Sequence, residues 1–572
     1  MSDLALAAPA RRRIDLATPL FAALALVLCV LVLLPLFWLG YYSLVDKKGA
    51  LTVANYAALF TDPTLGRSFL LATGMAASVG VLACAVATPL AWLVARTDMS
   101  GRRLIRMLVT ASFVTPPFLG AIAWEMLAAP NSGILNNLYR LLFGLGPDAH
   151  LLNIYSFSGL VFAITCYSFP LVFTLVANAL DRVPTDLEEA SAILGGGMFH
   201  TLRKITLPMV LPAMLAGVLV SVVQALTMFG SPAVLALPSG FHVITTKIWS
   251  LFQFPPKPGL AAACAVPLLL VTMLLLWGQK WLLGAKSYTV LGGKSGMPRL
   301  TALGRWRWLA GAYVVAVMGL TLVLPYLALL KTAITSTVSE PLNWQTLTAR
   351  NFNFVFFDFS PTRLALVNTL VLGLATATVL TAMVLLLAYV VARRTLPGAG
   401  LLGWLATAPV AIPGIVLGVG LFLSYANPVF GLYGTLWILL IAFLTLEMPS
   451  AYQQMTAAFN GLHPELEEAS RILGASRLQS LWQITAPLLG TNIIAVWCFV
   501  FIGTIRELSA TVLLTTANTK LVSVIIYDLN ESGDMGAISV LGLLLLSVSF
   551  CVVFAANRLP LLGGMRAVGH RT

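Results

Sequence analysis

The chain has 572 residues, of which 59% are hydrophobic and only 10% are charged. Soluble globular domains carry roughly 25% charged residues, so this composition excludes a water-soluble globule. The formal net charge of +13 could suggest a nucleic-acid-binding protein, but that function requires the basic residues to gather on one surface. The positions of the basic residues along the chain therefore decide whether the net charge indicates nucleic-acid binding.

Apolar runs of about 20 residues recur along the whole chain, and each is long enough to cross the ~30 Å hydrocarbon core of a bilayer as a helix. Strands of a membrane barrel would instead alternate over about ten residues. The sequence therefore predicts an all-α polytopic membrane protein with about twelve transmembrane helices. We expect them at 16–40, 68–95, 104–128, 156–181, 208–229, 259–283, 306–330, 365–392, 401–425, 433–458, 487–510 and 536–557.

The basic residues indicate which side of the membrane each loop faces. With Arg11–Arg13 in the cytoplasm, twelve spans place roughly two thirds of the 34 Lys and Arg residues on the cytoplasmic side, whereas Asp and Glu divide evenly. An excess of Lys and Arg in cytoplasmic loops is what the positive-inside rule describes. The charge therefore indicates a topology with both termini cytoplasmic, and it gives no reason to expect a nucleic-acid partner.

Two acidic segments of identical layout lie 279 positions apart. In each, a Glu-Glu-Ala-Ser run is followed by Gly six residues after the second Glu and by Pro nineteen residues after it. An acidic start and a glycine after the last turn are typical of a short helix. The paired carboxylates could accept charge-assisted hydrogen bonds from an Arg of a partner protein. The candidate docking residues are Glu188, Glu189, Ala190 and Gly195 in the first copy and Glu467, Glu468, Ala469 and Gly474 in the second.

A second repeated string supports two equivalent halves, because 91–96 matches 388–393 and closes the second predicted span of each half. Six spans in each half give both halves the same orientation, so they form two parallel six-helix repeats. The expected layout is a cytoplasmic tail (1–15), a first transmembrane unit (16–283) with a cytoplasmic coupling loop (182–207), a cytoplasmic linker (284–305), a second unit (306–557) with a coupling loop (459–486), and a cytoplasmic tail (558–572).

The repeated Glu-Ala-Ser pattern, with its later Gly and Pro, resembles the EAA loop of the permease subunits of binding-protein-dependent bacterial ABC importers. Two such units in one chain are similar to the iron(III)-type permeases, as are the strings at 116–124 and 506–511. The resemblance implies the transmembrane-domain fold of a type I ABC importer. It also implies that each loop, through Glu189, Ala190 and Gly195 and their counterparts, seats on a cytoplasmic ATPase subunit.

The resemblance further implies a permease of the bacterial inner membrane that receives ferric iron from a periplasmic binding protein. Thiamine, phosphonate or a polyamine are alternatives within the class, and an ion-coupled secondary transporter is the alternative from another class. The string at 292–295 does not complete a phosphate-binding loop, because Tyr288 stands where that motif needs Gly. We therefore expect no catalytic residue and no cofactor in this chain, with ATP and Mg²⁺ bound by two copies of the partner ATPase.

Ionisable groups at membrane depth are costly, so they are candidates for the translocation pathway. These are Glu447, Glu125 and Glu507, to which Tyr167 is added because hard oxygen donors suit a ferric ion. The alternative interpretation leaves Glu125 at the membrane interface and Glu507 in a local pair with Arg506. We assign no metal ligands, since the five histidines and six cysteines are scattered along the chain.

Overall fold

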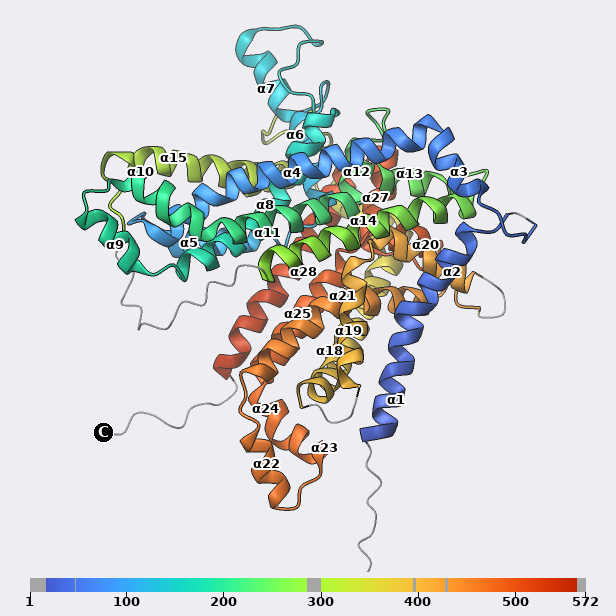
Figure 1. The fold of residues 1–572 in the computed structure, drawn as a ribbon. Helices are drawn as coiled ribbons and strands as arrows, with labels where there is room; N and C mark the ends of the chain where they lie inside the picture. The colour runs from blue at the N-terminus through green and yellow to red at the C-terminus, as the bar shows by residue number, and fades with distance from the viewer. Residues whose placement is uncertain (1–16, 47, 285–299, 394–397, 427–430, 563–572) are drawn as a thin grey trace, which may run out of the picture.

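The computed structural model describes residues 17–46, 48–284, 300–393, 398–426 and 431–562, and Figure 1 shows its fold. Within these residues every regular element is a helix, and the β contacts are isolated bridges. The predicted all-α class is therefore confirmed. The helices of the first half are α1 (Ala17–Leu28), α2 (Leu34–Ser43), α3 (Ala54–Thr61), α4 (Pro63–Arg96), α5 (Arg102–Ser112), α6 (Pro117–Ala128), α7 (Ile134–Phe143), α8 (Phe157–Asp181), α9 (Thr185–Ile193), α10 (Met198–Thr201), α11 (Leu207–Thr227), α12 (Gly230–Leu235), α13 (Ile244–Ser250) and α14 (Pro258–Gly284).

The second half repeats this order. Its helices are α15 (Arg307–Met318), α16 (Leu324–Ala333), α17 (Arg350–Asn353), α18 (Ser360–Ala392), α19 (Ala399–Thr407), α20 (Gly414–Tyr425), α21 (Leu436–Asn460), α22 (Glu465–Ile472), α23 (Arg477–Ser480), α24 (Ala486–Leu488), α25 (Gly490–Ile505), α26 (Thr511–Leu514), α27 (Val522–Ser532) and α28 (Met535–Leu562). The predicted segments 1–15, 284–305 and 558–572 lie wholly or largely outside the described residues.

Nine helices of the described chain are long and apolar enough to cross a membrane, and three bent helix pairs raise the number to as many as twelve. Each predicted span overlaps one of these. The expectation of single continuous runs is wrong at three places, where the chain bends by 99° between α5 and α6, by 109° before α20 and by 80° before α25. Pro116 and Pro413 directly precede the first two of the new helices, and proline cannot donate the hydrogen bond that would continue a helix.

The two halves interlock, because the first span of each half packs against the other half. Helix α2 contacts α20, and α1 contacts α18 and α19. In return, the Tyr313 hydroxyl on α15 donates a hydrogen bond to the Val86 carbonyl on α4 at 2.6 Å. Sequence periodicity could not indicate this exchange, so the two units are contiguous in sequence but not separate in packing.

An ion pair secures one of these crossings at the end of α4. The Asp98 carboxylate accepts a hydrogen bond from the Leu303 amide at 2.9 Å and pairs with the Arg307 guanidinium at 2.7 Å. The Leu303 amide and the Arg307 charge lower the pKa of the Asp98 carboxyl below its usual value. The start of α15 is thereby held beside the first half.

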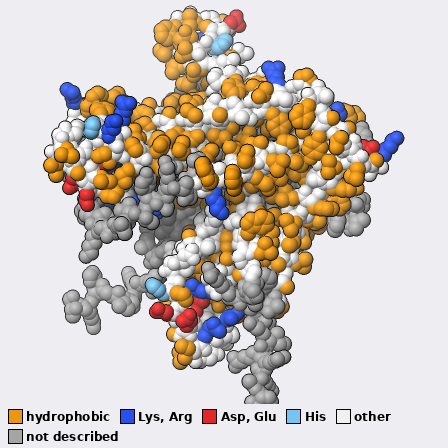
Figure 2. Space-filling view, in the orientation of Figure 1, with side chains coloured by type: hydrophobic (Ala, Val, Ile, Leu, Met, Phe, Trp, Pro, Cys, Tyr) orange, Lys and Arg blue, Asp and Glu red, His pale blue; other side chains and the backbone are white. Residues whose placement is uncertain are grey.

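The surface separates into an apolar body and polar tips. Figure 2 shows hydrophobic side chains over the long helices, whereas many of the charged side chains gather at the tips that carry α9 and α10 and α22 and α23. Many large apolar side chains of the long helices are exposed, for example Leu70, Leu274 and Trp277. Such a surface suits lipid contact, so the two polar tips lie outside the lipid-facing surface of the described chain.

Candidate functional site

Each polar tip is built from a coupling elbow of the same design. The first elbow (185–206) comprises α9, α10 and a π-helical turn at Leu202–Thr206, and the second elbow (465–485) comprises α22, α23 and a π-helical turn at Leu481–Thr485. The elements of the two elbows end at equivalent positions, as the repeated sequence predicts. The acidic residues lie in the first helix of each elbow.

A glycine ends the first helix of each elbow, as the sequence predicts. Gly195 has φ of +82° and Gly474 has φ of +94°, a left-handed conformation that costs other residues about 1–2 kcal/mol. The amide of the next residue then bonds back to the last turn, from Gly196 to the Ser191 carbonyl at 2.8 Å and from Ala475 to the Ser470 carbonyl at 3.1 Å. This pattern is a Schellman cap, and it fixes the direction in which the second helix leaves.

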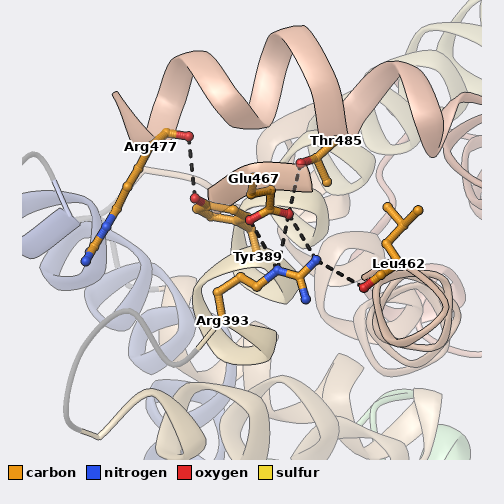
Figure 3. A network of polar contacts seen from close by, with 6 residues as sticks. All are labelled: Tyr389, Arg393, Leu462, Glu467, Arg477 and Thr485. Carbon is orange, nitrogen blue, oxygen red and sulfur yellow. Dashed lines mark hydrogen bonds and ion pairs between the residues drawn. The ribbon is translucent and has the colours of Figure 1, made fainter. Parts of the chain in front are cut away.

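The first glutamate of the second elbow is an internal anchor. Arg393, at the end of α18, donates hydrogen bonds to the Glu467 carboxylate from Nε at 3.1 Å and from Nη2 at 3.0 Å, and the Thr485 hydroxyl donates another at 2.9 Å. Figure 3 shows Arg393 and Thr485 meeting at this carboxylate. The Arg393 guanidinium also donates to the Leu462 carbonyl at 3.4 Å, so α18, α21 and α22 are joined at one point.

The first elbow repeats this anchor residue by residue. Glu188 accepts a hydrogen bond from the Thr206 hydroxyl at 2.8 Å and lies 3.6 Å from the Arg96 guanidinium at the end of α4. Arg96 is fully buried and donates to the carbonyls of Leu180 and Val183 at 2.6 and 2.5 Å. The matching strings 91–96 and 388–393 therefore place an arginine beside each elbow.

These anchors make each elbow a rigid extension of a membrane helix. Removing one partner of a buried ion pair typically costs about 3–5 kcal/mol, since the remaining charge is left uncompensated. A hydroxyl pair also braces the two helices of each elbow, Ser191 with Thr201 at 2.8 Å and Ser470 with Ser480 at 3.1 Å. A force applied at either elbow is therefore transmitted to α4 or α18.

The structure divides the predicted docking residues into two sets. Glu188 and Glu467 face their own arginines, and their side chains are only 16% and 8% exposed. The other predicted docking residues are exposed at the tips, namely Glu189, Ala190, Gly195, Glu468, Ala469 and Gly474. Their docking role remains a prediction.

Sequence analysis missed the apolar end of each elbow. The side chains directly before the capping glycines are almost fully exposed, at 85% for Ile193, 87% for Leu194, 86% for Ile472 and 88% for Leu473. Apolar residues this exposed at a polar tip indicate a surface that a partner covers. The signal was present in the sequence, because an Ile-Leu pair precedes the glycine in both copies.

Three of the four pathway candidates come together. Tyr167 on α8, Glu447 on α21 and Glu507 after α25 line one cavity of about 280 Å³ between the two halves. Glu125 does not line this cavity, and its carboxylate instead accepts a hydrogen bond from the Tyr155 hydroxyl at 2.6 Å. The structure therefore brings Tyr167, Glu447 and Glu507 together and leaves Glu125 apart from them, and a pathway role for any of the four remains a prediction.

The fold and these elbows define an internally repeated polytopic membrane protein that presents two matched, rigid loops outside its apolar body. The chain belongs to the family of binding-protein-dependent transport system inner membrane components, whose model matches residues 87–285 and 385–560. Each match includes one elbow, so the predicted fusion of two permease units is confirmed. Family membership also places the chain in the inner membrane and decides between a binding-protein-dependent permease and an ion-coupled secondary transporter in favour of the permease.

Relatives of this chain include ferric transport proteins. The ferric transport system permease protein FbpB of Actinobacillus pleuropneumoniae is 26% identical to this chain. The aligned region covers 77% of this chain and 63% of that protein's length. The Fe(3+)-transport system permease protein FbpB 2 of Haemophilus influenzae is 24% identical over 84% of this chain and 87% of its own. A bacterial ABC transporter that imports alginate has a solved structure with 15% identity and a TM-score of 0.41, covering 48% of this chain and 98% of that one.

Proposed function

We propose that the chain is the permease of an ATP-driven importer that takes up ferric iron delivered by a periplasmic binding protein. The observation that carries this proposal is the pair of coupling elbows, each anchored by a Glu–Arg–Thr cluster and each ending in an exposed Ile-Leu pair. Two equivalent docking surfaces fit two copies of one partner. That partner is a cytoplasmic ATPase subunit, which binds ATP and Mg²⁺ while this chain binds neither.

The elbows would couple ATP binding to movement of the halves. Closure of the ATPase dimer draws the two elbows together, and the Arg96–Glu188 and Arg393–Glu467 anchors transmit that movement to α4 and α18. The halves then rock about the cavity between them, which opens outward to receive substrate. Hydrolysis and release of the ATPase dimer return the pathway to the inside. In this arrangement the elbows and both termini are cytoplasmic, in agreement with the basic residues of the cytoplasmic segments.

Ferric iron is the favoured cargo because two relatives named for ferric transport align with 77% and 84% of this chain. The cavity suits a cationic cargo, since it presents two carboxylates and a phenol against the single guanidinium of Arg506, and hard cations prefer oxygen ligands. Thiamine, phosphonate and polyamine importers would use the same elbows. The binding protein that works with this chain distinguishes among them by the ligand it holds.

Uptake of radioactive iron by the native host tests this function. Deleting the gene should abolish high-affinity ferric uptake, and the wild-type chain should restore it. The variant with Glu189→Arg and Glu468→Arg should restore a rate of ferric uptake about tenfold below that of the wild-type chain. Reversing an exposed charge removes roughly 1 kcal/mol or less of binding free energy at each docking site. Membrane insertion should be unchanged. Wild-type uptake in the deletion strain would contradict the iron assignment, and wild-type uptake with both charges reversed would contradict a docking role for these glutamates.

A further inference from the structure

The cavity between the halves is built from equivalent segments of the two repeats. Pro117, at the start of α6, and Gly414, at the start of α20, both line it just after the bends that break their spans. Thr227 and Met228 line it from the first half, and Arg506 and Glu507, 279 positions later, line it from the second. The cavity therefore lies on the axis that relates the halves, where a substrate would pass.

Among the described residues that line this symmetric cavity, the charged ones all come from the second half. Glu447, Arg506 and Glu507 line it, and all three belong to the second half. The positions 279 residues earlier hold Ser168, Thr227 and Met228, which carry no charge. Charged residues buried in a membrane protein are expensive and default to a function. Since neutral residues occupy the equivalent positions of the first half, the repeated fold does not require charges here, and the charges of the second half are candidates for a function.

Two glycines leave space for the side chains of Glu447 and Tyr167 in the cavity. A Cβ atom at Gly503 on α25 would overlap the Glu447 carboxylate, and one at Gly120 on α6 would overlap the Tyr167 ring. The Tyr167 residue is 3% exposed, and its hydroxyl has no hydrogen-bond partner among the described residues although it lines the cavity. A buried hydroxyl without a partner costs free energy, which a ligand in the cavity would recover.

Arg506 ties the charged half to the neutral half. Its Nη1 donates a hydrogen bond to the Phe113 carbonyl at 2.8 Å, and its guanidinium lies 5.0 Å from the centre of the Phe113 ring. Phe113 directly follows α5, at the bend before α6. Arg506 also lines the same cavity as the carboxylates of Glu447 and Glu507. One of the Glu507 oxygens already accepts a hydrogen bond from the Ala510 amide at 2.8 Å, so Glu447 is the freer carboxylate.

We propose that this cavity is a transit site for a hard trivalent cation, in which Glu447, Glu507 and Tyr167 supply oxygen ligands and Arg506 is the counter-charge when the site is empty. An entering cation balances the two carboxylates in place of Arg506 and repels its guanidinium, which loosens the hydrogen bond from Arg506 to the Phe113 carbonyl, so that cargo entry and separation of the halves are linked. Three protein ligands leave further positions to water, and the resulting weak binding suits a site that must release its ion. The inference rests on the proposed function, because that function makes the cargo a cation.

Binding of Tb³⁺, a hard trivalent cation that stays in solution without a chelator, to the purified full chain tests this site without ATP or any partner. Equilibrium dialysis with metal analysis should show that Arg506→Gln binds Tb³⁺ at least tenfold more tightly than the wild type, because two carboxylates then lack their counter-charge. Adding Glu447→Gln should remove this gain. Adding Glu125→Gln, a carboxyl of the same protein that lies outside the cavity, should leave the gain intact. Equal binding by all four chains, or a gain that survives Glu447→Gln, would overturn the proposal.

A second measurement covers the case in which Arg506→Gln does not fold, as judged by gel filtration. In the otherwise wild-type chain, Glu447→Gln should lower ferric uptake by cells at least tenfold, whereas Glu125→Gln should change it less than twofold. Equal uptake by the two variants would overturn the transit site. Failure of the wild-type chain itself to support ferric uptake would overturn the proposed function instead, and the two failures are therefore distinguishable.

Discussion

Replacing Glu467 with glutamine should lower transport about a hundredfold or more. Glutamine keeps the shape of the side chain but removes the negative charge that faces Arg393, whose side chain is only 15% exposed. An uncompensated charge at a buried pair costs about 3–5 kcal/mol. Each 1.4 kcal/mol changes an equilibrium tenfold, so attachment of the second elbow to α18 would become about 10²–10⁴-fold less favourable. Uptake and protease cleavage within 465–485 measure the two consequences.

The neighbouring glutamate provides the matched control. Glu468 is exposed, so Glu468→Gln should leave protease resistance unchanged and reduce uptake only slightly. Exchanging the charges, with Arg393→Glu and Glu467→Arg together, should recover part of the resistance lost by Glu467→Gln. Normal uptake in Glu467→Gln would show that the anchor does not carry force between the elbow and the membrane helices.

Removing the apolar ends of the elbows should abolish association with the ATPase. Burying a large aliphatic side chain contributes about 1.5–3 kcal/mol, so the Ile-Leu pair of one elbow accounts for about 3–6 kcal/mol. Replacing Ile193, Leu194, Ile472 and Leu473 with serine should therefore weaken binding at each elbow by about 10²–10⁴-fold. The measurement is the amount of ATPase that co-purifies with the tagged chain from gently solubilised native membranes.

The exposed leucines of α7 provide a control for this change. Leu141 and Leu142 are 80% and 69% exposed, and α7 lies far from α22 and α23 in the fold (Figure 1). Leu141→Ser with Leu142→Ser should leave the co-purified ATPase unchanged. If the four-residue elbow variant retains the ATPase as well as the wild type does, docking occurs elsewhere on the chain.

Local patterns predicted the class of fold and the layout of the elbows. The lengths of the apolar runs indicated the spans, and the repeated spacing from Glu189 to Gly195 and from Glu468 to Gly474 predicted two short helices that end at glycine. These features depend on neighbours in sequence, through helix periodicity and the left-handed conformation that glycine adopts freely.

The contacts between distant segments could not be predicted in this way. Arg96 lies 92 positions before Glu188, and Arg393 lies 74 before Glu467, so nothing local indicated that the first glutamate of each pair faces inward. The separation of Glu125 from the cavity has the same cause, because its partner Tyr155 lies on the connection after α7. Packing of whole helices decides which of several buried carboxylates face the axis between the halves.

The stoichiometry of the native complex tests the central claim most directly. Mass spectrometry of the complex, solubilised gently from native membranes, should find two copies of an ATPase subunit for each copy of this chain. Ferric uptake by vesicles reconstituted with that complex and its binding protein should require ATP. Recovery of the chain alone, with uptake that follows an ion gradient and ignores ATP, would contradict the account.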